Sequence, residues 1–247
     1  MSIKNYLRAL ALGLLCCVSL AQAETAQEAG IRKLLEPRLG EGVKVDAITK
    51  TNYAGLYEVR MGSDIVYTDE KAQFIFAGNI FDSVNGTNYT KQRTEELLKI
   101  KFSDLPLESA IKSVKGDGKR VIAIFEDPNC GYCKKFRHTL TQVPNLTVYT
   151  FMYNILAEDS EVKSRNIWCS ANRVKAWDDW MLNNKEAPKA AASCKTPNEK
   201  VYELGRRLKV NGTPTLFFAD GTRSSGVIDI KTLEERLNAA QAKAAKP

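Results

Sequence analysis

The stretch FEDPNCGYCKKF, residues 125–136, places two cysteines three positions apart immediately after an apolar run. This run, RVIAIFED (residues 120–127), is continuous and rich in Val and Ile, as is typical of a strand that is buried on both faces. Pro128 ends the strand and Asn129 is a favourable N-cap residue, so we expect a helix from Cys130 onward. The sequence thus predicts a central strand, a tight turn and a helix that begins at the cysteines.

A cysteine pair at the start of a helix has the properties of a redox centre. Cys130 and Cys133 occupy positions i and i+3, which lie on one face of a helix. Unpaired backbone N–H groups and the helix dipole at the first turn stabilise an anion, so the pKa of Cys130 is expected below the reference value of about 8.5. Cys133 lies one turn deeper and is suited to be the resolving thiol.

Two other uses of this pair remain open on these residues alone. A structural zinc site needs four ligands, and the only histidine, His138, is turned away from both sulfurs by helical geometry. Cys169 and Cys194 would have to complete an all-cysteine site, although neither belongs to a Cys-x-x-Cys knuckle. The second alternative is a purely structural Cys130–Cys133 disulfide, but so small a loop restrains little unfolded-chain entropy. We expect no metal and no cofactor.

Cys169 and Cys194 are expected to form a structural disulfide. Both belong to a helix-rich polar segment, about residues 157–207, and neither has the context of a helix start. In the chain-entropy model, a loop of this size contributes roughly 3 kcal/mol to stability. Cα atoms more than about 7 Å apart would instead favour the metal alternative.

Residues 1–23 are predicted to be a signal peptide. Lys4 and Arg8 form a short basic region, the stretch from Leu7 to Leu20 is almost wholly apolar, and residues 21–23 (Ala-Gln-Ala) fit cleavage after Ala23. Export, expected here to the periplasm, leads to an oxidising compartment in which disulfides persist.

The residues disfavour two other interpretations of this N-terminal segment. A retained membrane anchor is disfavoured because the apolar run is shorter than the roughly 20 residues of a spanning helix. A lipid anchor on Cys16 or Cys17 is disfavoured because neither follows a small residue.

The net charge of +7 falls by two when the signal peptide is removed, and the basic residues of the remaining chain are interleaved with acidic ones. This pattern indicates a solvated surface and no nucleic-acid partner.

Residues 24–90 are predicted to form a small helix-and-sheet domain. Thr25 and Glu28 have capping-box spacing, and Pro37 and Gly40 end the short helix that follows. Four alternating stretches then predict an antiparallel sheet: residues 43–50, 56–61, 64–69 and 72–82. The region contains neither cysteine nor histidine, which favours a role in packing or assembly.

The remaining chain divides into a linker and a larger domain. Residues 91–101 predict a charged helix within a linker over residues 91–117, which either connects two domains rigidly or caps the first. In residues 118–247, strands are expected at 120–127, from Leu146, at TPTLFFADG and at SSGVIDI, with a final helix at the end. This order is that of a thioredoxin-like domain with a helical insertion, in an α+β protein.

The motifs together resemble one family. CGYC, the preceding F-x-D, the GTPT loop at residues 212–215 and the second cysteine pair resemble the DsbC/DsbG family of periplasmic thiol:disulfide interchange proteins. The resemblance covers the whole chain after the predicted signal. It implies that residues 24–90 are a cystatin-like dimerisation domain and that residues 118–247 are the catalytic domain.

The resemblance also implies a role for each matching residue. Cys130 is then the nucleophile, Cys133 the resolving cysteine, and Gly131 and Tyr132 tune the pair. Thr213-Pro214 becomes a cis-proline loop that binds substrate beside the cysteines. The sequence alone does not predict this bond, because about 95% of X–Pro bonds are trans.

Differences from thioredoxin and from DsbG indicate which type of protein in this family the chain resembles. Ile124 stands where thioredoxin carries a buried Asp, which points away from a cytosolic reductase. DsbG carries Pro after its first active-site cysteine and lacks the second pair, whereas this chain has Gly131 and Cys169/Cys194. The resemblance therefore implies a homodimeric disulfide isomerase that acts on misfolded exported proteins and is kept reduced by a membrane reductase of the DsbD type. A holdase chaperone, a DsbG-like reductant of oxidised cysteines and a monomeric oxidase are the alternatives.

Overall fold

The computed structural model describes residues 24–40 and 42–244, and the chain divides into two compact units between Ala77 and Gly78. The predicted signal peptide and its cleavage site lie outside the described residues. Within the described part of the chain, no helix is both long and apolar enough to cross a membrane.

The first unit is a helix packed on a four-stranded antiparallel sheet. Thr25 and Glu28 form the predicted capping box, in which Glu28 N–H donates to Thr25 Oγ1 (3.3 Å) and Thr25 N–H donates to Glu28 Oε2 (2.8 Å). The predicted antiparallel sheet is confirmed, with strand order β1-β2-β3-β4. The elements are α1 (Ala26–Leu35), the 3₁₀ turn η1 (Glu36–Arg38), β1 (Ala47–Lys50), β2 (Tyr57–Met61), β3 (Asp64–Thr68) and β4 (Ile75–Phe76). The core contains Ile31, Leu35, Val45, Ile48, Tyr57 and Val59.

The second unit is built on a five-stranded mixed sheet in the order β5-β7-β6-β8-β9. The strand predicted over residues 120–127 is confirmed as the central strand β6, which runs parallel to β7 and antiparallel to β8. The strands are β5 (Ile111–Lys115), β6 (Arg120–Glu126), β7 (Leu146–Met152), β8 (Thr215–Phe218) and β9 (Arg223–Ser225).

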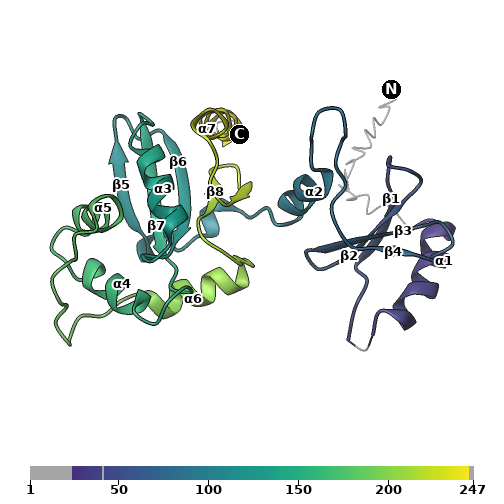
Figure 1. Ribbon diagram of the computed structural model, residues 1–247, viewed down its shortest axis with the longest axis horizontal. Coiled ribbons are helices and arrows are strands. Elements are labelled where there is room, and N and C mark those ends of the chain that lie inside the picture. The colour runs from purple at the N-terminus through teal and green to yellow at the C-terminus, as the bar shows by residue number, and fades with distance from the viewer. Residues whose placement is uncertain (1–23, 41, 245–247) are drawn as a thin grey trace, which may run out of the picture. The chain divides into compact units, whose positions relative to one another are not determined.

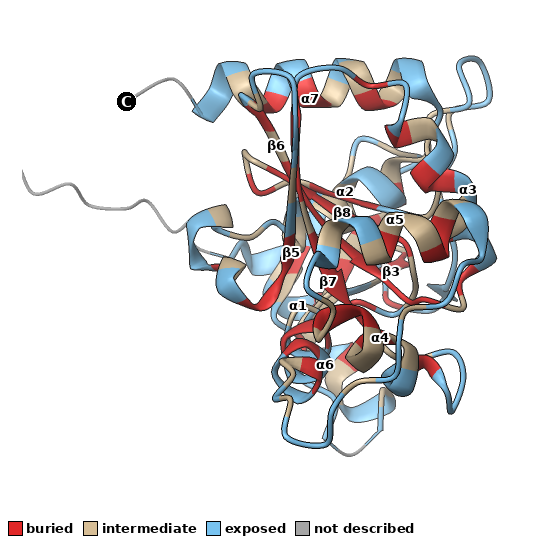
Figure 2. Ribbon diagram, turned by 90° about the vertical axis from the view of Figure 1, so that its left-hand side faces the viewer, coloured by how far each residue is buried: buried red, intermediate tan, exposed pale blue. Residues whose placement is uncertain are grey.

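Helices cover both faces of this sheet (Figure 1). Ile122 and Ile124 of β6 pack against α3 and α7, whereas Ala123 and Phe125 pack on the other face, with α6, because alternate residues of a strand point to opposite sides. Figure 2 shows the buried residues concentrated in the strands and on the inner sides of the helices. The helices are α2 (Tyr89–Leu97), the 3₁₀ turns η2 (Phe102–Asp104) and η3 (Leu107–Ser109), α3 (Gly131–Leu140), α4 (Ser160–Trp168), α5 (Arg173–Asn183), α6 (Asn198–Arg207) and α7 (Ile230–Ala244).

The segment predicted as a linker contains a strand of the larger sheet. β5 pairs antiparallel with β7, from Ile111 opposite Thr150 to Lys115 opposite Leu146. The sequence analysis missed this edge strand because two of its five residues are lysines. The charged helix of this segment is present as α2, and Glu95 of α2 forms an ion pair with Arg236 (3.7 Å).

The last strand begins earlier than predicted. β9 ends at Ser225, so the VIDI part of the predicted strand SSGVIDI is not a strand. Gly226 follows with φ of 84°, a left-handed conformation that ends the extended run. Its N–H donates to the Pro214 carbonyl oxygen (2.8 Å), which holds the chain after β9 close to the Thr213-Pro214 loop.

Candidate active site

The loop before the two cysteines is fixed by the buried carboxylate of Asp127. Asp127 Oδ1 accepts hydrogen bonds from Asn129 N–H (2.7 Å) and from the Ser160 hydroxyl (2.9 Å). Asp127 Oδ2 accepts from the N–H groups of Ile155 (2.7 Å) and Leu156 (3.0 Å). These four bonds join the end of β6 to the start of α4 and to the chain that follows β7.

Cys130, and not Asn129, is the N-cap of α3. Cys130 Sγ accepts a hydrogen bond from Cys133 N–H (3.2 Å), so the sulfur itself occupies the capping position. The predicted Asn129 cap is wrong because the Asn129 side chain is used elsewhere. Its Nδ2 donates to Ser160 Oγ (2.8 Å), and its Oδ1 accepts from Lys163 Nζ (2.6 Å).

The surroundings of Cys130 favour its thiolate. The pKa of Cys130 is lowered to about 6, chiefly by a hydrogen bond from the Cys133 side chain and further by Thr213 and by the N–H groups of Cys133 and Tyr132. Burial opposes this effect but does not outweigh it. Cys130 is therefore mostly ionised at neutral pH.

Cys133 has the opposite character. It is fully buried, and burial is the largest cause that raises its pKa, followed by its hydrogen bond to Cys130 and by the negative charge of Glu126. Cys133 therefore remains a thiol at neutral pH. The motif thus combines one sulfur whose pKa is lowered with one buried sulfur whose pKa is raised.

The loop of Thr213 and Pro214 lies beside the cysteines. Their peptide bond is cis. The Cys130 thiol, when protonated, donates to the Thr213 carbonyl oxygen (3.3 Å), although 83 residues separate the two in sequence. The fold therefore brings together the two segments that the resemblance paired.

Gly131 and Tyr132 form the first turn of α3 between the two cysteines. Tyr132 is 70% exposed, so its ring lies on the surface next to Cys130. A Cβ atom added to Gly131 would meet no other atom within 4 Å. Both positions therefore face solvent at the site.

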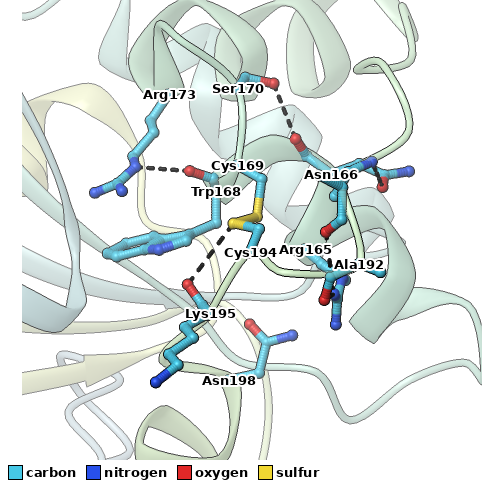
Figure 3. Close-up of a disulfide and its surroundings, with 12 residues drawn as sticks. Arg165, Asn166, Trp168, Cys169, Ser170, Arg173, Ala192, Cys194, Lys195 and Asn198 are labelled. Carbon is cyan, nitrogen blue, oxygen red and sulfur yellow. Dashed lines mark hydrogen bonds between the residues drawn. A yellow bond between two sulfur atoms is a disulfide. The ribbon is translucent and has the colours of Figure 1, made fainter.

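Cys169 and Cys194 are joined by a disulfide, with Cα atoms 6.2 Å apart (Figure 3). Cys169 is the C-cap of α4, and Cys194 lies in the loop before α6. Arg165 Nη2 donates to the Ala192 carbonyl oxygen (2.9 Å), and Arg173 Nε donates to the Trp168 carbonyl oxygen (2.7 Å). The disulfide and the Arg165 contact hold the loop before α6 against α4, and the Arg173 contact joins the start of α5 to the end of α4.

The sulfurs of this second pair are used by the disulfide and are not free to bind a metal together with Cys130 and Cys133. His138 is exposed on α3. Over residues 24–40 and 42–244, no group of three or more His, Cys, Asp or Glu side chains is placed to hold a metal ion.

Glu126 is a residue of the site that the sequence analysis missed. It is the last residue of β6 and is fully buried, and its pKa is raised to about 7, chiefly by burial. The sequence offered one signal, an acidic residue at the end of an otherwise apolar strand. Which helix it faces depends on tertiary packing, which the sequence pattern does not give.

Comparison with known proteins agrees with this geometry. A model described as "Thioredoxin-like domain" matches residues 107–241, and one described as "Disulfide bond isomerase protein N-terminal domain" matches residues 22–91. A probable thiol:disulfide interchange protein DsbC of Bordetella parapertussis is 45% identical over 217 residues, which cover 88% of this chain and 76% of the relative. The Escherichia coli K12 protein DsbC is 30% identical over 220 residues, which cover 87% of this chain and 89% of that protein.

The chain belongs to the DsbC family. A crystal structure of a disulfide interchange protein from Neisseria gonorrhoeae is also similar, with 39% identity and a TM-score of 0.53. The match covers 56% of this chain and 99% of that one. The α+β architecture, a thioredoxin-like domain plus the DsbC N-terminal domain, is therefore confirmed.

Membership of the DsbC family has direct consequences. The protein is a thiol:disulfide oxidoreductase, and the relatives support a disulfide isomerase role. A periplasmic location is the norm for the family. The family and its N-terminal domain also support a homodimer.

Proposed function

We propose that this protein rearranges and reduces incorrect disulfides in exported proteins, with Cys130 as nucleophile and Cys133 as resolving cysteine. One observation carries the proposal: Cys130 caps α3 beside Thr213, and its pKa is lowered to about 6, while the pKa of buried Cys133 is raised. Thiol–disulfide exchange requires a thiolate that attacks a disulfide sulfur. In the reduced site, Cys130 supplies this thiolate while Cys133 stays protonated.

The proposed reaction begins with the Cys130 thiolate. It attacks one sulfur of a substrate disulfide, a bond forms between Cys130 and that sulfur, and the other substrate sulfur leaves with the electron pair. A second substrate thiolate then attacks the mixed disulfide and regenerates the Cys130 thiolate, which completes an isomerisation. Alternatively, Cys133 attacks Cys130, and the substrate leaves reduced while the two cysteines form a disulfide.

The loop of Thr213 and Pro214 is proposed to bind the substrate next to Cys130. The contact between Cys130 Sγ and the Thr213 carbonyl oxygen supports this role, because it places the backbone of this loop directly beside the sulfur. Gly131 and Tyr132 are proposed to tune the pair from the exposed first turn of α3. The disulfide of Cys169 and Cys194 is proposed to be structural.

The edge of the N-terminal sheet is the proposed dimer contact. β4 pairs with β3 only at Tyr67 and Thr68, so no described strand lies beside residues 64–66 on that edge. Phe74, Ile75 and Phe76 on and next to β4 are 62%, 47% and 49% exposed. An open strand edge with apolar side chains favours pairing with a second copy.

The electron donor and the substrates are proposed from the exchange reaction itself. An isomerase must be kept reduced, so a membrane reductase of the DsbD type is the proposed electron donor, and misfolded exported proteins are the proposed substrates. The chain is proposed to be exported to the periplasm, with its signal peptide cleaved after Ala23.

Two cysteine variants test the proposal with a substrate protein whose disulfides have been scrambled. We expect Cys130→Ser to lose both reduction and isomerisation. Cys133→Ser should still form the mixed disulfide but should lose the intramolecular release, so the covalent complex accumulates on a non-reducing gel. Retained exchange in Cys130→Ser would overturn the assignment. Suppression of aggregation that survives in this variant would identify a separate holdase activity.

A further inference from the structure

Glu126 is a buried carboxylate that forms a long ion pair with Arg137 but has no hydrogen-bond partner among the described residues. Its side chain has no exposure, and neither of its carboxylate oxygens has a hydrogen-bond partner among the described residues. The nearest cation is Arg137, whose Nη1 lies 3.8 Å from Glu126 Oε2 and is itself without a hydrogen-bond partner. Burial of a carboxylate without hydrogen bonds lowers the stability of the fold, so the presence of Glu126 below the active site requires an explanation.

The strand period places Glu126 beneath the first turns of α3. Ile122, Ile124 and Glu126 are alternate residues of β6 and point to one face, and the first two pack against α3. The buried side of α3 carries Cys133 and, one turn later, Arg137. Glu126 therefore faces the part of α3 that contains the resolving cysteine.

The charges around Glu126 do not cancel. Arg137 also contacts Asp178 of α5, so one guanidinium serves two carboxylates. The remaining neighbours on the packed elements supply no cation: Trp177 of α5 contributes an indole, and Met152 of β7 lies opposite Glu126 in the sheet register. When Glu126 is ionised, Cys133 thus faces an excess of negative charge.

We propose that the negative charge of Glu126 disfavours ionisation of Cys133 and thereby slows its attack on Cys130. The mixed disulfide on Cys130 then persists until a substrate thiol resolves it. The inference rests on the proposed function, because it concerns the choice between the two exits from the mixed disulfide. Glu126 is a positioning residue in this role. It acts on Cys133 through its field and makes no hydrogen bond to the sulfur.

The direction of each shift supports this role. Glu126 contributes to the raised pKa of Cys133, and the charge of Cys130 in turn helps to raise the pKa of Glu126. Formation of the mixed disulfide removes the negative charge from Cys130. The pKa of Glu126 then falls, and its carboxylate becomes more fully ionised at the step in which release by Cys133 competes with isomerisation.

A chromogenic aryl disulfide separates the two steps in a stopped-flow experiment on the reduced full chain. In the first phase, the Cys130 thiolate forms a mixed disulfide and releases one aryl thiolate, at a rate proportional to reagent concentration. In the second phase, Cys133 loses its proton to solvent and attacks Cys130. The Cys130–Cys133 bond forms, the bond to the aryl sulfur breaks, and the second aryl thiolate leaves at a rate independent of reagent concentration.

Glu126→Gln removes the charge and keeps the shape. At pH 8 we expect its second phase to be roughly three- to tenfold faster, because a larger fraction of Cys133 is then ionised, an effect that is about half offset by the lower nucleophilicity of the more acidic thiolate. The first phase should stay within about twofold of wild type. As the pH falls through the lowered pKa that Glu126 has in the mixed disulfide, its carboxylate takes up a proton and the second-phase rates of the two proteins should converge.

Glu158→Gln is the matched control, since it removes the same charge from an exposed residue of the same unit, and it should match the wild type in both phases. An unchanged second phase in Glu126→Gln would contradict the proposal that Glu126 slows the attack by Cys133. A slower second phase would also contradict it and would indicate that Glu126 accepts the Cys133 proton. A wild type without a first phase would instead contradict the proposed function itself. With a scrambled substrate protein, Glu126→Gln should shift the products from isomerised towards reduced. Urea unfolding and circular dichroism verify that the variant is folded.

Discussion

The two cysteine pairs lie in the same unit of the molecule but have opposite surroundings. Cys130 and Cys133 are three residues apart at the start of a helix, where hydrogen bonds lower the pKa of Cys130 and burial raises the pKa of Cys133. Cys169 and Cys194 are 25 residues apart, join a helix end to a loop, and are bonded to each other. The comparison indicates that an exchange centre needs close spacing at a helix start together with a difference in surroundings that separates the pKa values of its two sulfurs.

Asp127 connects the two regions. Its carboxylate holds the loop before Cys130 and also Ser160, the first residue of α4, whose far end leads into Cys169. Breaking this connection should damage the first pair more than the second.

Asp127→Ala is expected to lower the free energy of unfolding by at least about 3 kcal/mol, because it leaves buried N–H groups without an acceptor and each bond to a charged group contributes about 1.5–3 kcal/mol. Asp127→Asn keeps one acceptor oxygen and should lose less. Urea unfolding of the reduced proteins measures both. The Cys169–Cys194 bond should remain intact in a thiol count. If Asp127→Ala were as stable as wild type, the loop would not depend on this carboxylate.

Replacing both Cys169 and Cys194 by Ala should cost about 2–4 kcal/mol of stability in the chain-entropy model. The rate at which iodoacetamide alkylates Cys130 should change less than about twofold, because no contact that lowers the Cys130 pKa involves this bond. Unfolding curves and alkylation kinetics test the two halves separately. A large loss of Cys130 reactivity in a folded variant would show that the second pair is part of the exchange centre.

The pH dependence of Cys130 alkylation should have its midpoint near pH 6. The depressed pKa means that the thiolate is present above this value and is lost as the pH falls through it. The alkylation rate should therefore fall about tenfold between pH 7 and pH 5, as expected for a single ionisation. Cys133, fully buried and with a raised pKa, should react far more slowly throughout. A midpoint near pH 8.5 or equal reactivity would contradict the roles of the two sulfurs.

Local signals in the sequence predicted the elements on which the first pair depends. The apolar run ending at Asp127 predicted the central strand, and the i,i+3 spacing predicted the helix, since both patterns need only neighbouring residues. The cap was assigned one residue too early because Asn129 has a strong cap propensity, and tertiary bonds to α4 overrode it. The strand at Ile111–Lys115 was missed for a related reason, because an edge strand needs only one buried face.

Glu126 marks the limit of prediction from one sequence. Its position after the apolar residues of β6 was visible, but its lack of a hydrogen bond depends on the distance to Arg137 and on how Arg137 is shared with Asp178. These distances arise from the packing of α3 and α5 on the sheet. No local pattern in the sequence encodes them.

The smallest expected effect is that of Gly131→Pro, which tests whether the residue between the cysteines tunes the pair without supporting the fold. Cys130 is extended (φ −76°, ψ 110°), as a residue before proline must be, and position 131 is the first of α3, where proline is well tolerated. A Cβ atom there meets nothing within 4 Å. Stability in urea should therefore stay within about 1 kcal/mol of wild type. If Gly131 tunes the pair, the equilibrium with glutathione should shift while the unfolding curve does not. A loss of more than about 2 kcal/mol would show that position 131 supports the fold, and an unchanged equilibrium would remove Gly131 from the residues that tune the exchange centre.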